Sequence, residues 1–193
     1  MRSFIISLKI FLFFTILTGI IYPLFVTGIA QLTFPSQANG SLILKNNVVV
    51  GSKLLGQQND SSIFFTSRPS ANSYNPLPSG GTNYGLTNSK LKEDVAERKR
   101  HFIAFNQLDS MTVVPSEMLF ASASGLDPHI SVNGAMLQVN RIAKARNLSS
   151  SQKQKLIQSV NAIRESPQFL CLGEERINVL LLNLKLGELV TQP

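Results

Sequence analysis

The sequence predicts an α+β protein: a single N-terminal transmembrane helix followed by one extracytoplasmic domain of short strands and about three helices. Three observations support this fold class. The stretch from Ile10 to Leu44 contains no charged residue, and its first part is almost wholly apolar. Short candidate strands bounded by turn residues come next. Apolar residues then recur at helical spacing in several later segments.

The transmembrane helix is expected over residues 10–30, after a cytoplasmic N-terminus of residues 1–9. A helix of about 20 residues rises roughly 30 Å, which matches the hydrocarbon core of a bilayer. Pro23 is expected to kink the helix, and Tyr22 suits the outer interface. The alternative is a signal peptide cleaved near residues 28–30, but the apolar run is longer than the usual core of such a signal.

Basic residues predict the orientation of this helix. Arg2 and Lys9 precede the span, and the next basic residue after it is Lys45. The positive-inside rule therefore places the N-terminus in the cytoplasm and the domain of residues 31–193 outside it.

The first part of the domain is expected to contain short strands and a long loop. Residues 41–50 predict a hairpin around Asn46-Asn47, with an apolar face formed by Leu42, Leu44, Val48 and Val50. Residues 63–65 form a short apolar strand or turn. Residues 67–88 are rich in Ser, Asn, Pro and Gly, which indicates a long ordered loop or a linker.

Helices and one further strand are expected in the remainder. Asn88 is placed to cap a first helix, and a second helix begins near Val132. Ser149 is placed to cap a third helix, which ends at Ser166-Pro167. Residues 177–186 alternate as a β-strand does and are rich in Val, Ile and Leu.

The charge and the single cysteine limit the possible partners. The formal net charge of +7 suggests nucleic acid or an anionic membrane surface. The pattern of residues 136–160 is similar to that of a basic helix-turn-helix motif. However, the domain is predicted to lie outside the cytoplasm, away from DNA. We therefore expect membrane lipid and no nucleic acid, and we interpret the segment as two packed helices with solvated lysines. Cys171 is expected to be a buried small hydrophobe.

Motifs for catalysis, cofactors and metals are mostly absent from the sequence. It contains no G-x-x-x-x-G-K-[ST] loop, no G-x-G-x-x-G and no H-E-x-x-H. The stretch from Ala121 to His129 holds Ser, Asp and His close together, but neighbours in sequence rarely align as a catalytic triad. We expect a tight turn in which Asp127 accepts backbone N–H bonds and Pro128 fixes the chain. The alternative is a membrane-anchored exported hydrolase that uses residues 121–131.

The order and spacing of many short motifs resemble the C subunit of the bacterial Kdp complex, the KdpC family. The resemblance runs from the membrane helix almost to the C-terminus, and its strongest piece is Ala121-Ser122 with Ser124-Gly125-Leu126-Asp127-Pro128-His129-Ile130-Ser131. The other pieces are Tyr22-Pro23-Leu24, Phe34-Pro35, Arg68-Pro69-Ser70-Ala71, Ser79-Gly80-Gly81-Thr82-Asn83, Gln138-Val139 with Arg141, and Asn178-Val179-Leu180. Ala123 departs from the family pattern, which has glycine there.

The resemblance implies a non-catalytic accessory subunit of a high-affinity potassium-transporting P-type ATPase in a bacterial plasma (inner) membrane. Its implied partners are a channel-like A subunit, the P-type ATPase B subunit and a small F subunit. The family is described as a catalytic chaperone that raises the ATP affinity of the B subunit. With no phosphate loop in the sequence, and with the domain predicted opposite the cytosolic ATP site, ATP is expected to act only through the ATPase subunit.

The resemblance also suggests which residues shape or dock this subunit, and it assigns no catalytic, cofactor-binding or metal-ligating residue. The docking or structural candidates are Tyr22, Pro23, Arg68, Pro69, Gly80, Gly81, Asn83, Ser124, Gly125, Asp127, Pro128, His129 and Arg141.

Overall fold

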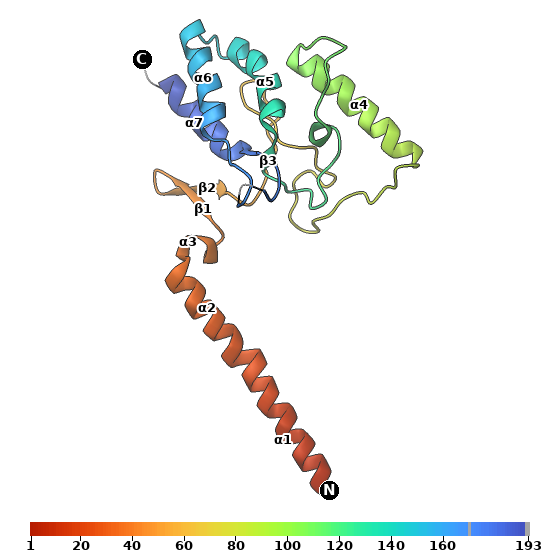
Figure 1. Ribbon diagram of the computed structural model, residues 1–193, viewed down its shortest axis with the longest axis vertical. Coiled ribbons are helices and arrows are strands. Elements are labelled where there is room, and N and C mark those ends of the chain that lie inside the picture. Colours follow the sequence, from red (N-terminus) through yellow and green to blue (C-terminus); the bar gives the residue numbers. More distant parts are fainter. Residues whose placement is uncertain (170, 192–193) are drawn as a thin grey trace. The chain divides into compact units, whose positions relative to one another are not determined.

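The computed structural model describes residues 1–169 and 171–191, and it confirms an α+β protein (Figure 1). The chain divides into two compact units, Met1–Ser52 and Lys53–Pro193. Each unit is described by itself.

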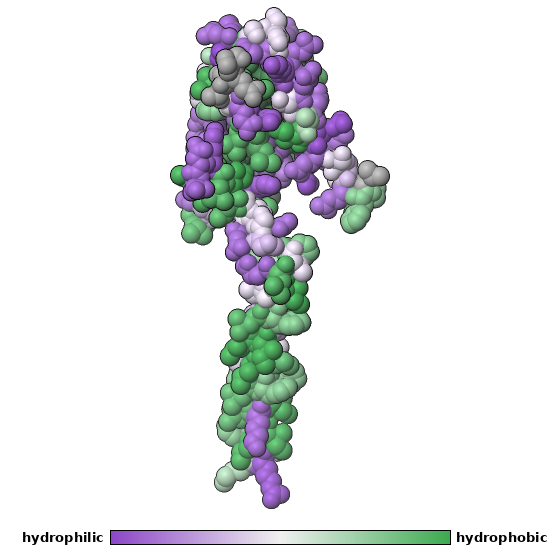
Figure 2. Space-filling model, turned by 90° about the vertical axis from the view of Figure 1, so that its left-hand side faces the viewer, coloured by the Kyte–Doolittle hydropathy of each residue, from purple (hydrophilic) through white to green (hydrophobic). Residues whose placement is uncertain are grey.

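The first unit opens with a continuous helix that is long and apolar enough to cross a membrane, Arg2–Thr33. It comprises α1 (Arg2–Ile16), a π-helical turn η1 (Leu17–Ile21) and α2 (Tyr22–Thr33). None of these three segments contains a buried residue, and apolar side chains cover most of the helix (Figure 2). The helix contains the expected span of residues 10–30 and extends beyond it at both ends.

Pro23 explains the π-helical turn. A proline inside an α-helix lacks an N–H donor, and its ring clashes with the carbonyl four residues earlier. In the structure the preceding turn widens, so that the Tyr22 N–H donates to the carbonyl of Leu17. Neighbouring hydroxyls are satisfied locally, because Thr15 and Thr18 donate to the carbonyls of Phe11 and Phe14. The predicted disturbance at Pro23 therefore takes the form of a widened turn.

A short helix and a hairpin complete the first unit. Helix α3 (Pro35–Ala38) leads into β1 (Leu42–Lys45) and β2 (Val48–Ser52), which pair antiparallel. Asn46 and Asn47 adopt φ values of 53° and 62°, as the tight turn of a two-residue hairpin requires. The hairpin prediction is confirmed.

The predicted single apolar face of this hairpin is wrong. A register irregularity lies between Ile43 and Leu44, so that Leu44 pairs with Val49 and Lys45 pairs with Val48. Directly paired residues share a face of the sheet. Leu44 and Val48 therefore project from opposite faces, and both are exposed.

The second unit is built on four helices that pack in succession. Helix α6 (Ser150–Ala162) contacts both α5 (Val132–Ala145) and α7 (Val179–Thr191), and α4 (Ser89–Asn106) contacts α5 (Figure 1). The strands β3 (His129–Ile130) and β4 (Ile177–Asn178) pair antiparallel, and η2 (Ser116–Met118) is a single 3₁₀ turn. The main core side chains are Phe65, Phe102, Met118, Ile130, Val139, Ile142, Leu156, Val160, Ile177, Leu182 and Leu186.

The predicted helix starts are confirmed by their caps. The Asn88 side chain accepts from the backbone of Lys90 and Leu91, and Ser149 forms a reciprocal capping box with Gln152. The end of α6 differs from the prediction, because this helix stops at Ala162, before Ser166-Pro167.

The predicted strand over residues 177–186 is mostly wrong. Only Ile177–Asn178 is extended, and α7 occupies the rest. An apolar run fits either period, but Val179, Leu182 and Leu186 recur at helical spacing and are almost fully buried. The Asn178 side chain also accepts the backbone N–H of Leu181, as a helix cap does. The described part of this unit thus holds one long helix more than the sequence predicted.

Candidate functional site

Two loops that are distant in sequence interlock at the surface of the second unit. The Ser122 N–H donates to the carbonyl of Pro69 over 3.1 Å. The Gly80 N–H donates to the carbonyl of Ser124 over the same distance. The predicted loop of residues 67–88 is therefore ordered, and backbone hydrogen bonds join it to residues 121–131.

Gly125 lies where these loops approach most closely. Its φ is +71°, and a Cβ built there would lie 2.2 Å from Oδ1 of Asn72. Asn72 cannot move freely, because its amide donates to the carbonyls of Asn75 and Pro78. Only glycine therefore fits position 125 both in conformation and in space.

The side chains of Arg68 and Asp127 connect the same two loops. Nη1 of Arg68 lies 2.8 Å from Oδ2 of Asp127, and Oδ1 of Asp127 accepts the backbone N–H of His129 over 3.0 Å. Burial by itself would raise the pKa of Asp127, but hydrogen bonds from His129 and Arg68 outweigh it and lower this pKa to about 2. The carboxylate is thus ionised and fully engaged in holding the turn.

Tyr74 supports Arg68 from the other side, because its hydroxyl donates to the Arg68 carbonyl. Burial raises the pKa of Tyr74 to about 12, so the phenol remains a donor. The buried Nε of Arg68 has no hydrogen-bond partner in the described part of the chain.

His129 links the turn to the C-terminal part of the domain. Its Nδ1 lies 3.4 Å from Asp127, and its Nε2 lies 3.9 Å from Glu165. Glu165 in turn binds Nε of Arg176 at 2.9 Å. The backbone continues this link, since His129 pairs with Asn178 and the carbonyl of Pro128 accepts the Val179 N–H.

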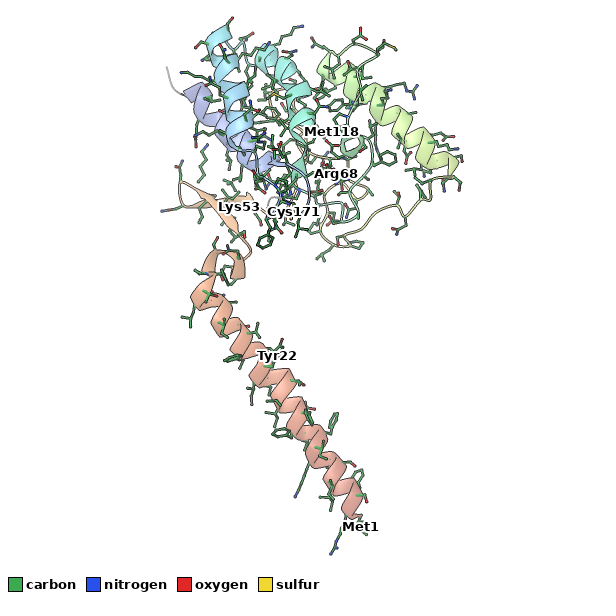
Figure 3. All side chains as sticks on the ribbon, viewed as in Figure 1. Met1, Tyr22, Lys53, Arg68, Met118 and Cys171 are labelled. Carbon is green, nitrogen blue, oxygen red and sulfur yellow. The ribbon has the colours of Figure 1, made fainter. Side chains whose placement is uncertain are left out.

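Two hollows flank the interlocked loops. A cavity of about 430 Å³ is lined mainly by charged residues, among them Arg68, Asp127, His129 and Arg176. A second cavity of about 740 Å³ is lined by apolar residues, among them Met118, and by polar residues, among them Asp94 and Glu97. Met118 lies near Arg68 in Figure 3. The sequence did not indicate the second cavity, because its walls come from segments far apart in the chain.

Arg141 is a structural residue of the core. It is only 3% exposed in spite of its charge. Its guanidinium donates to Asn106, Gln138 and the carbonyls of Ser62 and Phe64. Burial lowers the pKa of Arg141 to about 10. The side chain thus fixes residues 61–64 against α5.

Three other candidates do not take part in the contacts described above between the two loops, and one further prediction is wrong. Tyr22 and Pro23 belong to the membrane helix of the first unit, and Asn83 is an exposed loop residue with a φ of 55°. Cys171 is exposed, so its predicted burial is wrong. Its neighbours in sequence are apolar, but Gln168 and Leu172 form a bridge that places it in a turn.

Local hydrogen bonds engage the polar side chains of the loop. The Ser124 hydroxyl accepts the N–H of Leu126, and Asp127 is held by Arg68. A catalytic triad instead needs a serine hydroxyl bonded to a histidine that is oriented by a carboxylate. His129 makes no such bond to a serine in the described residues, and no group of three potential metal ligands occurs among them.

These features define a class: a protein whose described residues include one helix able to cross a membrane and an α+β domain stiffened by two interlocked loops. Comparison with known proteins gives the family. The model of the family described as KdpC, the c chain of the K+-transporting ATPase, matches residues 4–188, and the chain belongs to this family.

Named relatives agree with the family assignment over nearly the whole chain. The potassium-transporting ATPase KdpC subunit of Leptospira interrogans is 42% identical over 94% of this chain and 91% of its own length. The subunit of that name from Mycobacterium tuberculosis strain H37Rv is 44% identical over 97% of this chain and 99% of its own length. The one from Pectobacterium atrosepticum is 42% identical over 97% of both chains.

Proposed function

We propose that this chain is a non-catalytic accessory subunit of an ATP-driven potassium-uptake complex and is needed for its assembly. The observation that carries the proposal is the family match over residues 4–188. The proposed partners are a channel-like A subunit, a P-type ATPase B subunit and a small F subunit.

The apolar helix Arg2–Thr33 anchors the subunit in the plasma membrane. Arg2 and Lys9 lie at one end of this helix, and no acidic residue precedes Asp60. This distribution favours a cytoplasmic N-terminus, a span over residues 10–30 and a domain of residues 31–193 on the outer side.

The interlocked loops present a preformed surface for a partner subunit. Backbone hydrogen bonds, the Arg68–Asp127 ion pair and the close approach at Gly125 restrict the movement of both loops. A surface that is ordered before binding loses little conformational entropy on binding. Ala123 and Ser124 are exposed, and their small side chains let another surface approach the backbone.

Any effect of this subunit on ATP is a coupling between subunits. The proposed topology places the domain on the side of the membrane opposite a cytosolic ATP site, so direct contact is not part of the proposal. Coupling requires only that the subunit bind the ATP-competent state of its partners more tightly than the other states. By reciprocity, binding of ATP to the partner then raises the affinity of the partner for this subunit.

The Asp127→Ala variant tests the docking role of the loops. It removes the acceptor for Arg68 and for the His129 N–H, which loosens the turn. A looser turn must lose more conformational freedom on docking, and about 1.4 kcal/mol of such a cost lowers an association constant tenfold. We expect a several-fold lower yield of assembled complex from mildly solubilised membranes, with the subunit itself still present.

Arg164→Ala is the matched control, because it removes an exposed ion pair with Glu175 at 3.2 Å. Exposed pairs contribute little to stability, so this variant should assemble like the wild type. Equal yields for the Asp127 and Arg164 variants would refute the role proposed for the loop.

A further inference from the structure

The β1–β2 hairpin displays apolar side chains that the first unit does not cover. Leu44 and Val48 are each 64% exposed, and Val49 is 53% exposed. Because the register places Leu44 and Val48 on opposite faces, both faces of the hairpin carry apolar surface. Its tip, by contrast, is polar, since Asn46 and Asn47 form the turn beside Lys45.

Hydrogen bonds fix the base of this hairpin close to the end of the membrane helix. The side-chain amides of Gln31 and Asn39 bind each other reciprocally at 3.2 Å, which ties α2 to the residue after α3. The Ser52 hydroxyl at the end of β2 donates to the carbonyl of Gly40 at 2.7 Å. The hairpin therefore cannot move far from the point where the helix ends.

Exposed apolar surface is continuous from the helix towards the hairpin. Leu32 and Phe34 are both largely exposed and lie between the apolar part of the helix and β1. The helix Arg2–Thr33 is about 48 Å long, whereas the hydrocarbon core is about 30 Å thick. An end of the helix must thus reach into the interfacial region, and the hairpin follows within a few residues.

The charge of this segment also suits a bilayer surface. The first 59 residues contain no Asp or Glu, and the basic residues Lys45 and Lys53 lie at the tip and just beyond the base of the hairpin. Both lysines are exposed. An anionic headgroup layer attracts such cations, and the long stem of lysine lets its charge stay in the headgroup layer above apolar neighbours.

We infer that the β1–β2 hairpin lies in the headgroup region of the membrane and forms a second lipid contact beside the spanning helix. This inference rests on the proposed anchoring of the chain. The polar tip keeps the hairpin at the interface, and its apolar side chains enter the upper part of the acyl region. Lipid contact at both the helix and the hairpin limits how far the hairpin can move away from the membrane surface.

Depth-dependent fluorescence quenching tests the inference on the full chain. Cys171 is exposed and is replaced by serine, and a single cysteine is then introduced as Val48→Cys, Leu24→Cys or Lys90→Cys. Each variant is labelled with an environment-sensitive dye and reconstituted into vesicles of phosphatidylcholine and phosphatidylglycerol. Lipids that carry a quencher high on the acyl chain should lower the signal at Val48 about twofold, as for a group at the acyl boundary.

The two other positions make the outcomes separable. Leu24 lies in the expected span and should be quenched by lipids labelled deep in the chain, whereas Lys90 on α4 should not be quenched by either lipid. An unquenched label at Val48 together with a quenched one at Leu24 would overturn the hairpin inference and leave the anchor intact. An unquenched label at Leu24 would overturn the proposed anchor and the hairpin inference together. Adding Leu44→Ser to the Val48→Cys variant should weaken the quenching of the label at position 48. Unchanged quenching would contradict an apolar contact between the hairpin and the lipid.

Discussion

Gly125→Ala should destabilise the domain considerably more than the same substitution at Gly173. Both glycines have positive φ, +71° at Gly125 and +90° at Gly173. A Cβ at position 173 meets nothing within 4 Å, whereas one at position 125 would overlap Oδ1 of Asn72 at 2.2 Å. Both variants lose free energy of unfolding because alanine disfavours a positive φ. Only Gly125→Ala also loses free energy through the steric overlap between the two loops.

The expected difference can be worked out from these contacts. The left-handed conformation costs an alanine about 1–2 kcal/mol at either position. Displacing Asn72 adds overpacking and strains its bonds to the carbonyls of Asn75 and Pro78, which contributes about 2 kcal/mol more at position 125. For a domain of this size the additional loss corresponds to a melting temperature about 4–8 °C lower.

Thermal melting of the full chain in detergent, followed by far-ultraviolet circular dichroism, measures this difference. The membrane helix keeps its hydrogen bonds in a micelle, so the transition reports the second unit. Gly125→Ala should melt several degrees below Gly173→Ala. Equal melting temperatures would show that the loops do not approach each other as closely as the structure indicates.

Three further predictions follow from the site and the proposed topology. Asp127 has a pKa lowered from 3.8 to about 2, so the stability that its carboxylate contributes is present above pH 3.8 and is lost as the pH falls towards 2. The difference in melting temperature between the wild type and Asp127→Asn should therefore become smaller over that pH range. A difference that stays constant would contradict an ionised Asp127 in the turn. His129→Ala should leave ATPase turnover per assembled complex within a few-fold of wild type, whereas loss of a general base would cost about 10²–10⁴-fold. A reporter fused after Pro193 should be active only outside the cytoplasm, and activity of a reporter restricted to the cytosol would reverse the proposed orientation.

Local signals in the sequence were sufficient for much of the fold. The charge-free stretch predicted the apolar helix, Asn46-Asn47 predicted the hairpin, and Asn88 and Ser149 predicted helix starts. Each of these signals acts over a few residues, through a cap, a turn or a run of apolar side chains. For such features the local preference and the tertiary structure agree.

The errors arose where distant segments decide the structure. Val179 to Leu186 fits a strand or a helix by pattern, and packing against α6 selects the helix. The partners of Arg141 could not be predicted either, because they are the carbonyls of residues 61–64 and the Asn106 side chain. Nothing in the local sequence shows that these acceptors are near.

The candidate site was predicted in part. Asp127 was expected to accept a backbone N–H, and it accepts that of His129. Its ion pair with Arg68, which lies 59 positions earlier, could not be read from spacing. The resemblance to a family had placed both residues among the candidates, although it gave no reason to connect them.

Purification from mildly solubilised membranes tests the central claim most directly. The full chain, expressed from its native locus with a C-terminal tag, should bring down a P-type ATPase and a channel-like potassium subunit, and the eluate should hydrolyse ATP. The chain purified alone from cells that lack those partners should show no hydrolytic activity. A chain that elutes without partners from cells grown under potassium limitation, or that hydrolyses ATP by itself, would contradict the account.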